Sequence, residues 1–331
     1  MNKLTAFLAL VIGTAVTINA QAESRTALAV KTARPPVIDG KLGVAEWTGA
    51  LWQNSFTSYG ADEAQTPQQS RFAVMFDDKN MYFAVRCEDV HVKKIKPYYK
   101  NNVGIWRHDG VEIFIQSIAQ SGKYLQFLIS AGGGRCGLKI AVSPTCTRIK
   151  TRDEVPLTQW QAEAALDSGG YVIEIKIPLA LFTGGKPVNG TEWRLNVHRN
   201  ALTPDSDRYS TWAPMIKTHA SEKFGYLIFA FAEPELIQMR ITRKRKFNAL
   251  VSRIEKLQAK YAKFDPQFAA AVNTRLKAAG WEKFRQTGIE IEKMNRAECE
   301  KFALQLSKFA AQAENFKQFR ADYLKRAFFK E

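Results

Sequence analysis

The chain has 331 residues, of which 46% are hydrophobic and 24% are charged, as in an ordinary globular protein of about two domains. The formal net charge is +16, and residues 236–331 carry 22 Lys and Arg against 10 Asp and Glu, which accounts for +12 of it. The basic character therefore belongs mainly to the C-terminal segment. After residue 22, no stretch is long and apolar enough to span a membrane.

The first 22 residues are typical of a secretory signal peptide. A short basic start is followed by an apolar run, Leu4–Ile18, and then by the small-x-small pattern Ala20-Gln21-Ala22. We expect cleavage after Ala22 and a secreted or periplasmic bacterial protein. A retained anchor is the weaker alternative because the apolar run is short for a bilayer. The absence of a cysteine at the cleavage point argues against a lipoprotein.

Short runs of alternating apolar and polar residues extend from residue 29 to residue 230. They are separated by Gly, Pro, Asn and Asp, which is typical of β-strands joined by turns. Few helical patterns lie between them, so we predict a mainly β fold, an antiparallel β-sandwich over residues 23–232. Seven strands are predicted, over residues 71–76, 81–87, 111–117, 124–130, 171–177, 193–198 and 226–229.

The segment Trp106–Ile115 carries the strongest local indication of a binding site. Apolar residues at positions 111, 113 and 115 alternate with Glu112 and Phe114, as in a strand with two different faces. An aromatic ring close to a carboxylate suits a sugar, because the C–H face of the sugar stacks on the ring and its hydroxyls donate to the acid. In the alternative interpretation, Trp106 caps the edge of the core and Glu112 accepts a structural hydrogen bond.

Cysteines and acids allow two further hypotheses. Cys136 and Cys146 lie ten residues apart beside turn residues, and in an oxidising compartment they can form a disulfide. Cys87 lies in a predicted strand and Cys299 in helical sequence, and none of the spacings is that of a zinc site. Calcium is a possible cofactor because acids near turns are hard oxygen donors, although they can equally be ordinary turn residues. These acids are Asp77, Asp78, Glu88 and Asp89.

After Pro234 the apolar period changes to that of a helix, with a stripe of residues spaced three and four apart from Phe247 to Phe264. Short links between the helices favour an antiparallel hairpin or a small bundle. We therefore predict a basic α-helical domain over residues 233–331. Three helices are predicted, and they include residues 247–264, 266–279 and 295–329.

Seven motifs of the β region, taken in order, resemble the carbohydrate-binding module family 9-like domains, which have a DOMON-like sandwich. The similarity covers about residues 30 to 230 and does not include the helical tail. The resemblance implies the sandwich fold and carbohydrate binding. The motifs are Pro36–Leu42 with Glu46-Trp47, Phe76–Val85 with Glu88-Asp89, Trp106–Ile115, Gly170–Pro178, Leu195–Arg199, Trp212-Ala213-Pro214 and Phe224-Gly225.

Sugar-binding members of this family clamp a terminal sugar between two tryptophans, while an acid and an arginine bind its hydroxyls. Trp106 and Glu112 match one tryptophan and the acid. The arginine position falls near Leu128, and Lys217-Thr218-His219 stands where the second tryptophan would lie, so the two-tryptophan clamp is incomplete. The candidate ligand-binding residues are Trp106, Glu112, Asp109, Gln126 and His219, and Tyr98-Tyr99 is another possible replacement for the missing aromatic.

Some motif residues have explanations that need no ligand. Glu174 and Asn196 can be buried polar groups with satisfied hydrogen bonds. No catalytic constellation is evident, because Gly132-Gly133-Gly134 lacks the Lys-Ser/Thr of a P-loop and the four histidines lack metal-ligand spacing. Haem remains an alternative by resemblance to other DOMON domains, although no pair of axial ligands is evident.

We therefore expect an exported, non-catalytic protein that binds a polysaccharide or oligosaccharide and can be an accessory to polysaccharide degradation. In the alternative, the sandwich is structural and the basic helices, richest in Lys and Arg over Arg240–Lys246, contact an anionic envelope surface or a protein partner. A glycoside hydrolase-associated activity is a lesser alternative. Export argues against nucleic acid as a partner.

Overall fold

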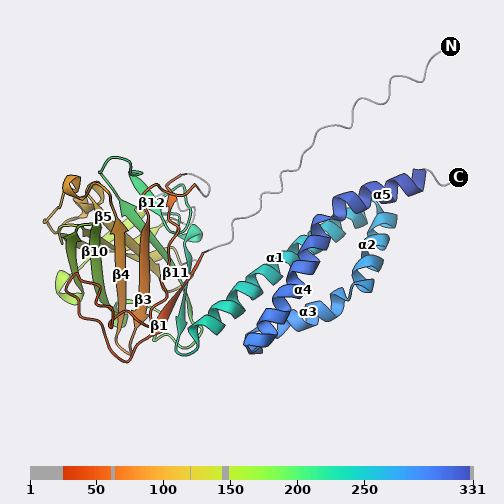
Figure 1. Ribbon diagram of the computed structural model, residues 1–331, viewed down its shortest axis with the longest axis horizontal. Helices are drawn as coiled ribbons and strands as arrows, with labels where there is room; N and C mark the ends of the chain where they lie inside the picture. Colours follow the sequence, from red (N-terminus) through yellow and green to blue (C-terminus); the bar gives the residue numbers. More distant parts are fainter. Residues whose placement is uncertain (1–24, 61–63, 120, 144–148, 329–331) are drawn as a thin grey trace, which may run out of the picture.

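The computed structural model describes residues 25–60, 64–119, 121–143 and 149–328. The predicted signal peptide, residues 1–22, lies outside them. Strands form the first part of the described chain and helices the second (Figure 1). The strands are β1 Thr26–Lys31, β2 Thr57–Ser58, β3 Ser70–Phe76, β4 Asn80–Glu88, β5 Gly110–Gln116, β6 Lys123–Ser130, β7 Arg135–Val142, β8 Ile149–Val155, β9 Gln161–Asp167, β10 Gly170–Pro178, β11 Glu192–Asn200, β12 Tyr209–Thr211 and β13 Gly225–Ala230.

The strands form one curled sheet that folds over itself as a sandwich, with the order β8-β7-β6-β5-β11-β13-β1-β3-β4-β10-β9. The predicted sandwich is confirmed, but it is not wholly antiparallel, since β1 pairs in parallel with both β13 and β3. A parallel pair needs a long connection, and residues 32–69 between β1 and β3 provide one. All seven predicted strands are present within two residues of the expected bounds.

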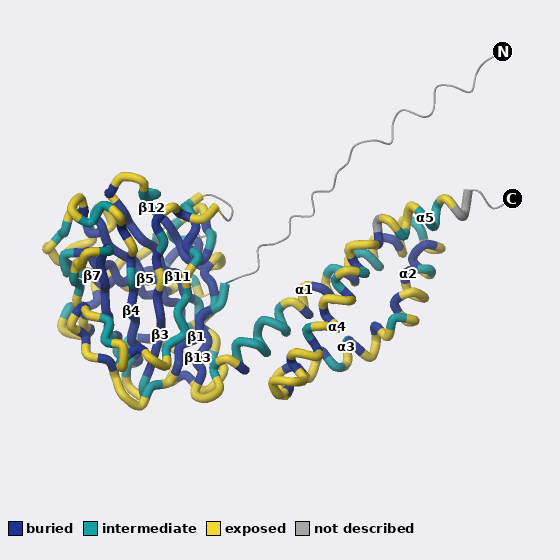
Figure 2. The backbone as a smooth tube through the Cα atoms, viewed as in Figure 1, coloured by how far each residue is buried: buried dark blue, intermediate teal, exposed yellow. Residues whose placement is uncertain are grey.

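Alternation along the strands builds the core between the two halves of the sheet. On β5, Val111, Ile113 and Ile115 are fully buried in this core, together with aromatic and aliphatic residues of β3, β4, β6, β10 and β11. Figure 2 shows the buried residues concentrated along these strands. Because side chains alternate across a strand, Glu112 and Phe114 of β5 lie on the outer face of their half of the sheet.

Each outer face carries its own small apolar cluster. One lies over β5, β6 and β7 and includes Phe114, Tyr124 and Leu128, covered by Ile105 and Met215 from the loops. The other lies over β3 and β4 and is made of Ile38, Trp47, Ala73, Met75, Tyr82 and Ala84. The loops of the sandwich are therefore packed against both outer faces, and this packing positions the polar groups described below.

The helical part contains more helices than predicted. They are α1 Pro234–Phe264, α2 Pro266–Ala278, α3 Trp281–Ile289, α4 Arg296–Glu314 and α5 Phe316–Phe328. The prediction missed α3, which starts directly after Gly280 because this glycine adopts a left-handed φ of 82° that turns the chain. The predicted third helix is divided at Asn315, a poor residue for a helix interior.

The helices have a core of their own, in which the Phe, Leu and Ile stripe of α1 packs against α2, α3 and α4. The first turns of α1 contact the sandwich, where Ile237 and Ile241 pack on Leu28, Val30 and Ile228, and Arg245 further along reaches Tyr226 and Glu192. The rest of the helical part extends away from the sheet (Figure 1). Within the described ranges, no helix is both long and apolar enough to cross a membrane.

Candidate functional site

The candidate site is the outer face of β5, β6 and β11 around Glu112, called here the Glu112 face. Glu112 has a relative exposure of 5%. Its two oxygens accept hydrogen bonds from two side-chain amides, at 2.6 Å from Gln126 Nε2 on β6 and at 2.9 Å from Asn200 Nδ2 on β11. Three neighbouring strands therefore hold one carboxylate from both sides.

The two amides each keep an unused acceptor. Gln126 and Asn200 are buried, and among the described residues Gln126 Oε1 and Asn200 Oδ1 have no hydrogen-bond partner. A buried carbonyl without a donor is costly, and buried polar groups are almost always paired. The site thus contains two unsatisfied acceptors beside a carboxylate, all of them buried in this structure.

Burial raises the pKa of the Glu112 carboxyl above its ordinary value, while the hydrogen bonds from Asn200 and Gln126 and the charge of Arg152 act in the opposite direction. Arg152 lies on β8. In the sheet it stands opposite Ile140 of β7, which in turn stands opposite Tyr124 of β6. The cation nearest this site in the sheet therefore comes from β8 and not from the strand next to β5.

Trp106 lies in the short helical turn η2, Val103–Arg107, which immediately precedes the Glu112 strand. Its neighbour Ile105 is fully buried in the outer cluster with Phe114 and Tyr124, and this anchors the turn on the sheet. Trp106 itself has a relative exposure of 39%, and the Arg107 guanidinium lies 4.9 Å from its ring centroid. The indole is thus held at the surface by an anchored turn.

His219 is brought to this face from the loop before β13. Its Nδ1 lies 2.5 Å from the hydroxyl of Tyr124, which precedes Gln126 by two residues and shares its face of β6. Burial and the charge of Arg152 lower the pKa of His219 to about 4. The neighbouring His198 is buried beneath Phe114, with ring centroids 4.5 Å apart, and burial together with His219 lowers its pKa to about 3.

Asp109 is fully buried and does not face the same ligand space. Its two oxygens accept backbone N–H bonds from Lys96 at 3.0 Å and Leu202 at 2.8 Å. This carboxylate therefore ties two loops to the start of β5, which positions η2 and the strand. Of the five candidate residues, Glu112, Gln126 and His219 lie on the Glu112 face, Trp106 lies in the turn that leads into it, and Asp109 is used as a structural acceptor.

The structure shows where two residues near the incomplete clamp lie, Leu128 at the arginine position and Trp212 upstream of the position of the second tryptophan. Leu128 stands directly opposite Glu112 in the β5–β6 register and is fully buried in the outer cluster. Trp212 is 1% exposed and packs edge-on against Phe72, 5.2 Å between ring centroids, inside the sandwich core. Neither residue can supply the arginine or the second ring on the Glu112 face.

One other residue of this face, Asn200, was missed by the sequence interpretation. Asn200 lies two residues beyond the predicted end of its strand. Because side chains alternate along β11, Asn196, His198 and Asn200 lie on the same face. A longer predicted strand would have shown this. Tyr98, proposed as a replacement ring, is instead stacked on His108 at 4.0 Å, and Tyr99 is 72% exposed.

The predicted disulfide is not seen in the structure. Cys136 carries a free thiol that is buried on the outer face of β7, and Cys146 lies outside the described residues. Burial raises the pKa of the Cys136 thiol to about 11, so it is protonated at neutral pH. Cys87 and Cys299 are also buried free thiols.

The four acids considered for calcium are engaged with other groups of the chain. Asp77 accepts the backbone N–H groups of Lys79 and Asn80, each at 2.7 Å, and so closes the β3–β4 turn. The other three pair with cations, Asp78 with Lys31, Glu88 with Arg86 and Asp89 with Arg199. Among the residues that the structure describes, no three His, Cys, Asp or Glu side chains are grouped to hold a metal ion. The structure therefore does not support a calcium site at these acids.

The basic segment Arg240–Lys246 is largely used inside the molecule. Arg240 Nε donates to the Met294 carbonyl at 2.7 Å, and Arg243 makes a longer contact of 3.4 Å with the Cys299 carbonyl. Lys244 pairs with Glu292, and Arg245 lies 3.6 Å from Glu192 of the sandwich. The densest run of positive charge in the sequence is thus mostly a set of packing contacts of α1.

Comparison with known families decides the relationship. A family model for the carbohydrate family 9 binding domain-like group matches residues 38–227. The chain belongs to this family. The match includes the Glu112 face, and it ends before α1, so the helices lie outside the family domain. No curated protein matches the chain.

Solved structures are similar to the same region. A proposed carbohydrate-binding protein from Bacteroides uniformis shares 13% identity with a TM-score of 0.50, covering 62% of this chain and 99% of its own. A carbohydrate-binding module family 9 from Caldicellulosiruptor kristjanssonii is similar in its complex with glucose, at 19% identity and a TM-score of 0.46 over 63% of this chain and 97% of that one. The structure of a family 9 module from the same organism in complex with cellotriose is similar at 19% identity and a TM-score of 0.44, covering 63% of this chain and 95% of that one.

Proposed function

We propose that this family 9-like protein is an exported, non-catalytic carbohydrate-binding protein and that its sugar site is the Glu112 face. The observation that carries the proposal is the pair of unpartnered amide oxygens, Gln126 Oε1 and Asn200 Oδ1, beside the Glu112 carboxylate. Sugars carry adjacent hydroxyls, each of which can donate a hydrogen bond. Membership of the family supports the same ligand class.

In this proposal the sugar hydroxyls donate to Glu112 and to the two amide oxygens, which relieves the cost of leaving these acceptors buried and unpaired. Because Glu112 is only 5% exposed, it lies at the bottom of the site, where an inserted hydroxyl and not a whole ring reaches it. The half-exposed indole of Trp106 offers a face for C–H stacking. With one exposed ring and few buried groups, the affinity should be modest.

Export rests on the sequence of residues 1–22, which has the basic start, apolar run and small-x-small end of a cleaved signal peptide. A secreted or periplasmic sugar-binding protein without a catalytic constellation suits an accessory role in polysaccharide degradation, beside a separate enzyme. Mass spectrometry of the mature protein recovered from culture medium or periplasm tests export, since an N-terminus at Gln21 or earlier in all fractions would contradict cleavage after Ala22.

Isothermal titration calorimetry with glucose, cellotriose and other neutral oligosaccharides tests the site. We expect the wild type to bind at least one of them and Glu112→Gln to lose most of that affinity, because an amide cannot offer two acceptor oxygens. Glu163→Gln, on the exposed face of edge strand β9, is the matched control and should bind as the wild type does. Equal binding by the wild type and Glu112→Gln would reject this site.

Contact between the basic helices and an anionic surface or protein partner stays a prediction of the sequence. No observation in the structure favours it, since four residues of Arg240–Lys246 already contact acceptors of the same chain. A glycoside hydrolase-associated activity is likewise not favoured by any arrangement of described side chains.

A further inference from the structure

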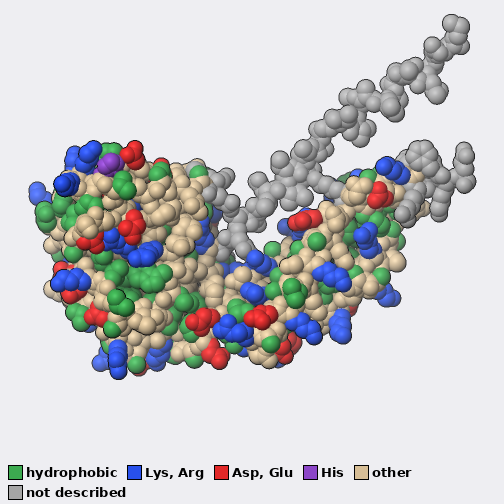
Figure 3. All heavy atoms as spheres, viewed as in Figure 1, with side chains coloured by type: hydrophobic (Ala, Val, Ile, Leu, Met, Phe, Trp, Pro, Cys, Tyr) green, Lys and Arg blue, Asp and Glu red, His purple; other side chains and the backbone are tan. Residues whose placement is uncertain are grey.

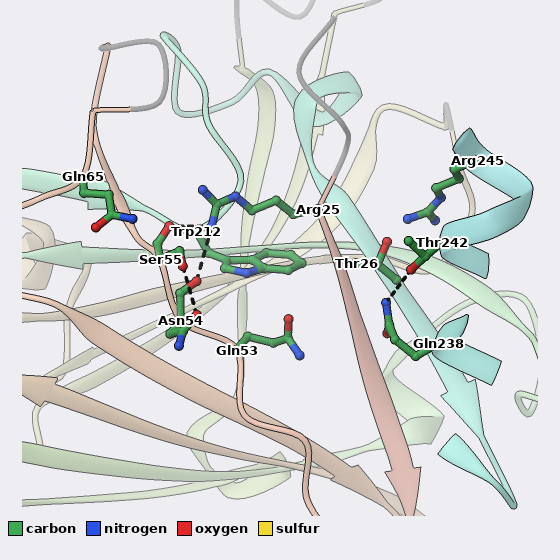
Figure 4. Close-up of a pocket in the computed structure, with 10 residues that line it drawn as sticks. All are labelled: Arg25, Thr26, Gln53, Asn54, Ser55, Gln65, Trp212, Gln238, Thr242 and Arg245. Carbon is green, nitrogen blue, oxygen red and sulfur yellow. Dashed lines mark hydrogen bonds between the residues drawn. The ribbon is translucent and has the colours of Figure 1, made fainter. Parts of the chain in front are cut away.

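A second hollow lies at the junction between the sandwich and α1, away from the Glu112 face. Its volume is about 560 Å³, within the range of small-ligand sites. One wall comes from the start of β1 and the segment before β2, and the opposite wall comes from α1 (Figure 4). We call it the junction pocket, and its lining residues are Arg25, Thr26, Gln53, Asn54, Ser55, Gln65, Trp212, Gln238, Thr242 and Arg245.

The lining is chemically uniform in a way that points to a ligand class. Seven of these ten side chains are amides or hydroxyls, two are guanidinium groups and one is an indole, and none of the described lining residues carries a carboxylate. Amides and hydroxyls both donate and accept hydrogen bonds, which matches a hydroxyl-rich ligand. Guanidinium groups bind carboxylates through two parallel hydrogen bonds.

The sandwich wall is held in place before any ligand arrives. The Arg25 guanidinium donates to the backbone carbonyls of Ser55 at 2.5 Å and Asn54 at 3.3 Å, and Figure 4 shows these contacts at the side of the Trp212 ring. Ser55 has a left-handed φ of 67°, a conformation that costs energy for a residue with a Cβ. A strained segment kept next to a hollow is typical of a binding site.

Trp212 forms the base of the pocket and is locked by its neighbours. Phe72 packs edge-on against it at 5.2 Å, and a Cβ on Gly225 would lie only 2.6 Å from its ring. Only glycine at position 225 leaves room for the indole. The base of the pocket is therefore rigid, although the indole is only 1% exposed and offers a ligand almost no surface.

The helical wall is fixed as well. Gln238 Nε2 donates to Thr242 Oγ1 at 3.3 Å, one turn apart on α1. The Arg245 guanidinium lies 3.8 Å from the ring centroid of Tyr226 and 3.6 Å from Glu192, both on the sandwich. Figure 4 shows Arg245 on α1, on the right, and Arg25 near the centre with its guanidinium directed toward Asn54 and Ser55, so each wall of the pocket contributes one guanidinium group.

We propose that the junction pocket is a second carbohydrate site, for a saccharide unit that carries a carboxylate, and that α1 supplies one of its walls. The amides and hydroxyls take the sugar hydroxyls, and the guanidinium groups take the acidic group. This gives the helical part a role in recognition, through Gln238, Thr242 and Arg245. It does not depend on sugar binding at the Glu112 face.

Titration of the full-length mature protein with trigalacturonic acid tests the proposal, and cellotriose is the neutral comparison. We expect trigalacturonic acid to bind, and Arg245→Gln to weaken it by about tenfold through loss of a charge-assisted hydrogen bond. Because Arg245 also touches Tyr226 and Glu192, Thr242→Val is the second variant. It replaces the hydroxyl, which also accepts from Gln238 Nε2, by a methyl group of similar size and should weaken binding by about threefold. Raising the salt concentration should weaken the same interaction.

Two controls separate this site from the other. Arg253→Gln lies further along α1, away from the pocket lining, and should bind trigalacturonic acid as the wild type does. Glu112→Gln should also keep trigalacturonic acid binding, even where it loses neutral sugars. No binding of trigalacturonic acid by the wild type, or equal binding by the wild type, Arg245→Gln and Thr242→Val, would overturn the proposal and leave the Glu112 site untouched.

Discussion

Two buried glutamates lie on the two outer faces of the sandwich, and they have opposite surroundings. Both come from strands whose alternate residues fill the shared core, Glu112 from β5 and Glu174 from β10. Burial raises the pKa of both carboxyls. The two carboxylates differ in the groups that donate hydrogen bonds to them. The donors to Glu174 carry no unpaired acceptor, whereas the two amides that donate to Glu112 each keep an unpaired carbonyl oxygen.

Glu174 is satisfied by the backbone and by one indole. Its Oε1 accepts from Trp47 Nε1 at 2.9 Å, and its Oε2 accepts from the backbone N–H groups of Asp39 at 3.1 Å and Gly40 at 3.0 Å. None of these donors brings a second, unused acceptor into the site. The family motifs around residues 38–47 and 170–178 are thus joined by one carboxylate, and they serve the fold.

Glu112 is held by side-chain amides, and each amide that donates also exposes a carbonyl. This leaves Gln126 Oε1 and Asn200 Oδ1 unpartnered in the described structure. This difference predicts that Glu112, and not Glu174, takes part in ligand binding. Four predictions test the distinction.

Glu174→Ala should have the largest effect, on stability. The substitution leaves the Trp47 indole N–H and two backbone N–H groups buried without an acceptor, at about 1–3 kcal/mol for each fully buried donor, so we expect a loss of about 4 kcal/mol. Urea denaturation followed by circular dichroism measures it. Sugar binding per folded molecule should stay unchanged, and a stability loss below that of Glu163→Gln would contradict the structural role.

Lowering the pH should destabilise the folded protein through the buried histidines of the Glu112 face. The ordinary pKa of His198 is 6.5, and burial with the nearby His219 lowers it to about 3 in the folded protein. Since the folded pKa is lowered, the stability is present above pH 6.5 and is lost as the pH falls, by about 1.4 kcal/mol per pH unit for this residue. Between pH 6.5 and about pH 4.5, the loss is about 3 kcal/mol.

The measurement is the free energy of unfolding as a function of pH for the wild type and His198→Gln. Subtracting the two curves removes the contributions of Glu112 and Glu174, whose raised pKa values act in the opposite direction. We expect the difference to shrink steadily below pH 6.5. Parallel curves would mean that His198 is protonated in the folded protein and that the face is more open to water than its burial indicates.

Sequence alone predicted the sandwich because its strands follow a strict period of two. The same period placed Glu112 opposite the core. It could not reveal β8 and β9, since these edge strands carry charged and small residues along most of their length, and an edge strand has less apolar surface to bury. β1 and its parallel pairing were equally hidden, because pairing depends on the long connection after it.

The site was less predictable than the fold. Trp106, Glu112, Gln126 and His219 were proposed from motifs, and their ligand role stays a prediction. The difference between a ligand acceptor and a structural acceptor lies in hydrogen bonds between distant strands. Asp109 illustrates this, as its sequence position beside Trp106 suggested a ligand role while its oxygens accept from Lys96 and Leu202. The two departures from the clamp were visible in the sequence, because Leu128 and Lys217-Thr218-His219 are residue types that the clamp does not use.

Glu112→Gln should have the next largest effect, and this effect should be mainly on sugar binding and not on folding. It replaces a buried charge by a neutral amide of the same shape, and one of the two amide donors loses its acceptor unless it turns its own carbonyl toward the new N–H. Stability should therefore fall by about 1–2 kcal/mol, well below the loss expected for Glu174→Ala. Neutral sugar affinity should fall by about 2 kcal/mol, or about thirtyfold, for the loss of a charged acceptor. Calorimetry and urea denaturation on the same sample separate the two quantities, and a loss of stability as large as that of Glu174→Ala would place Glu112 in the structural class.

The pH dependence of binding adds a second readout for the same carboxylate. Because burial raises the pKa of Glu112, the acceptor becomes protonated at a higher pH than an ordinary glutamate, and sugar affinity should fall as the pH drops through this raised value. Glu112→Gln, which cannot titrate, should show no such fall apart from the histidine effect on folding. An affinity that stays constant down to the ordinary glutamate range would show that the ionised form is not the one that binds.

Trp106→Ala should have the smallest effect, because the indole is 39% exposed and a stacking contact at such a position contributes about 1 kcal/mol. We expect neutral sugars to bind about fivefold more weakly, with stability nearly unchanged since the anchor of the turn is Ile105 and not the indole. Tyr99→Ala removes a more exposed ring, 72% accessible, and serves as the control. If Tyr99→Ala weakens binding and Trp106→Ala does not, the stacking ring comes from the segment before η2 and not from the family position at Trp106. The distinction between the two glutamates would still hold.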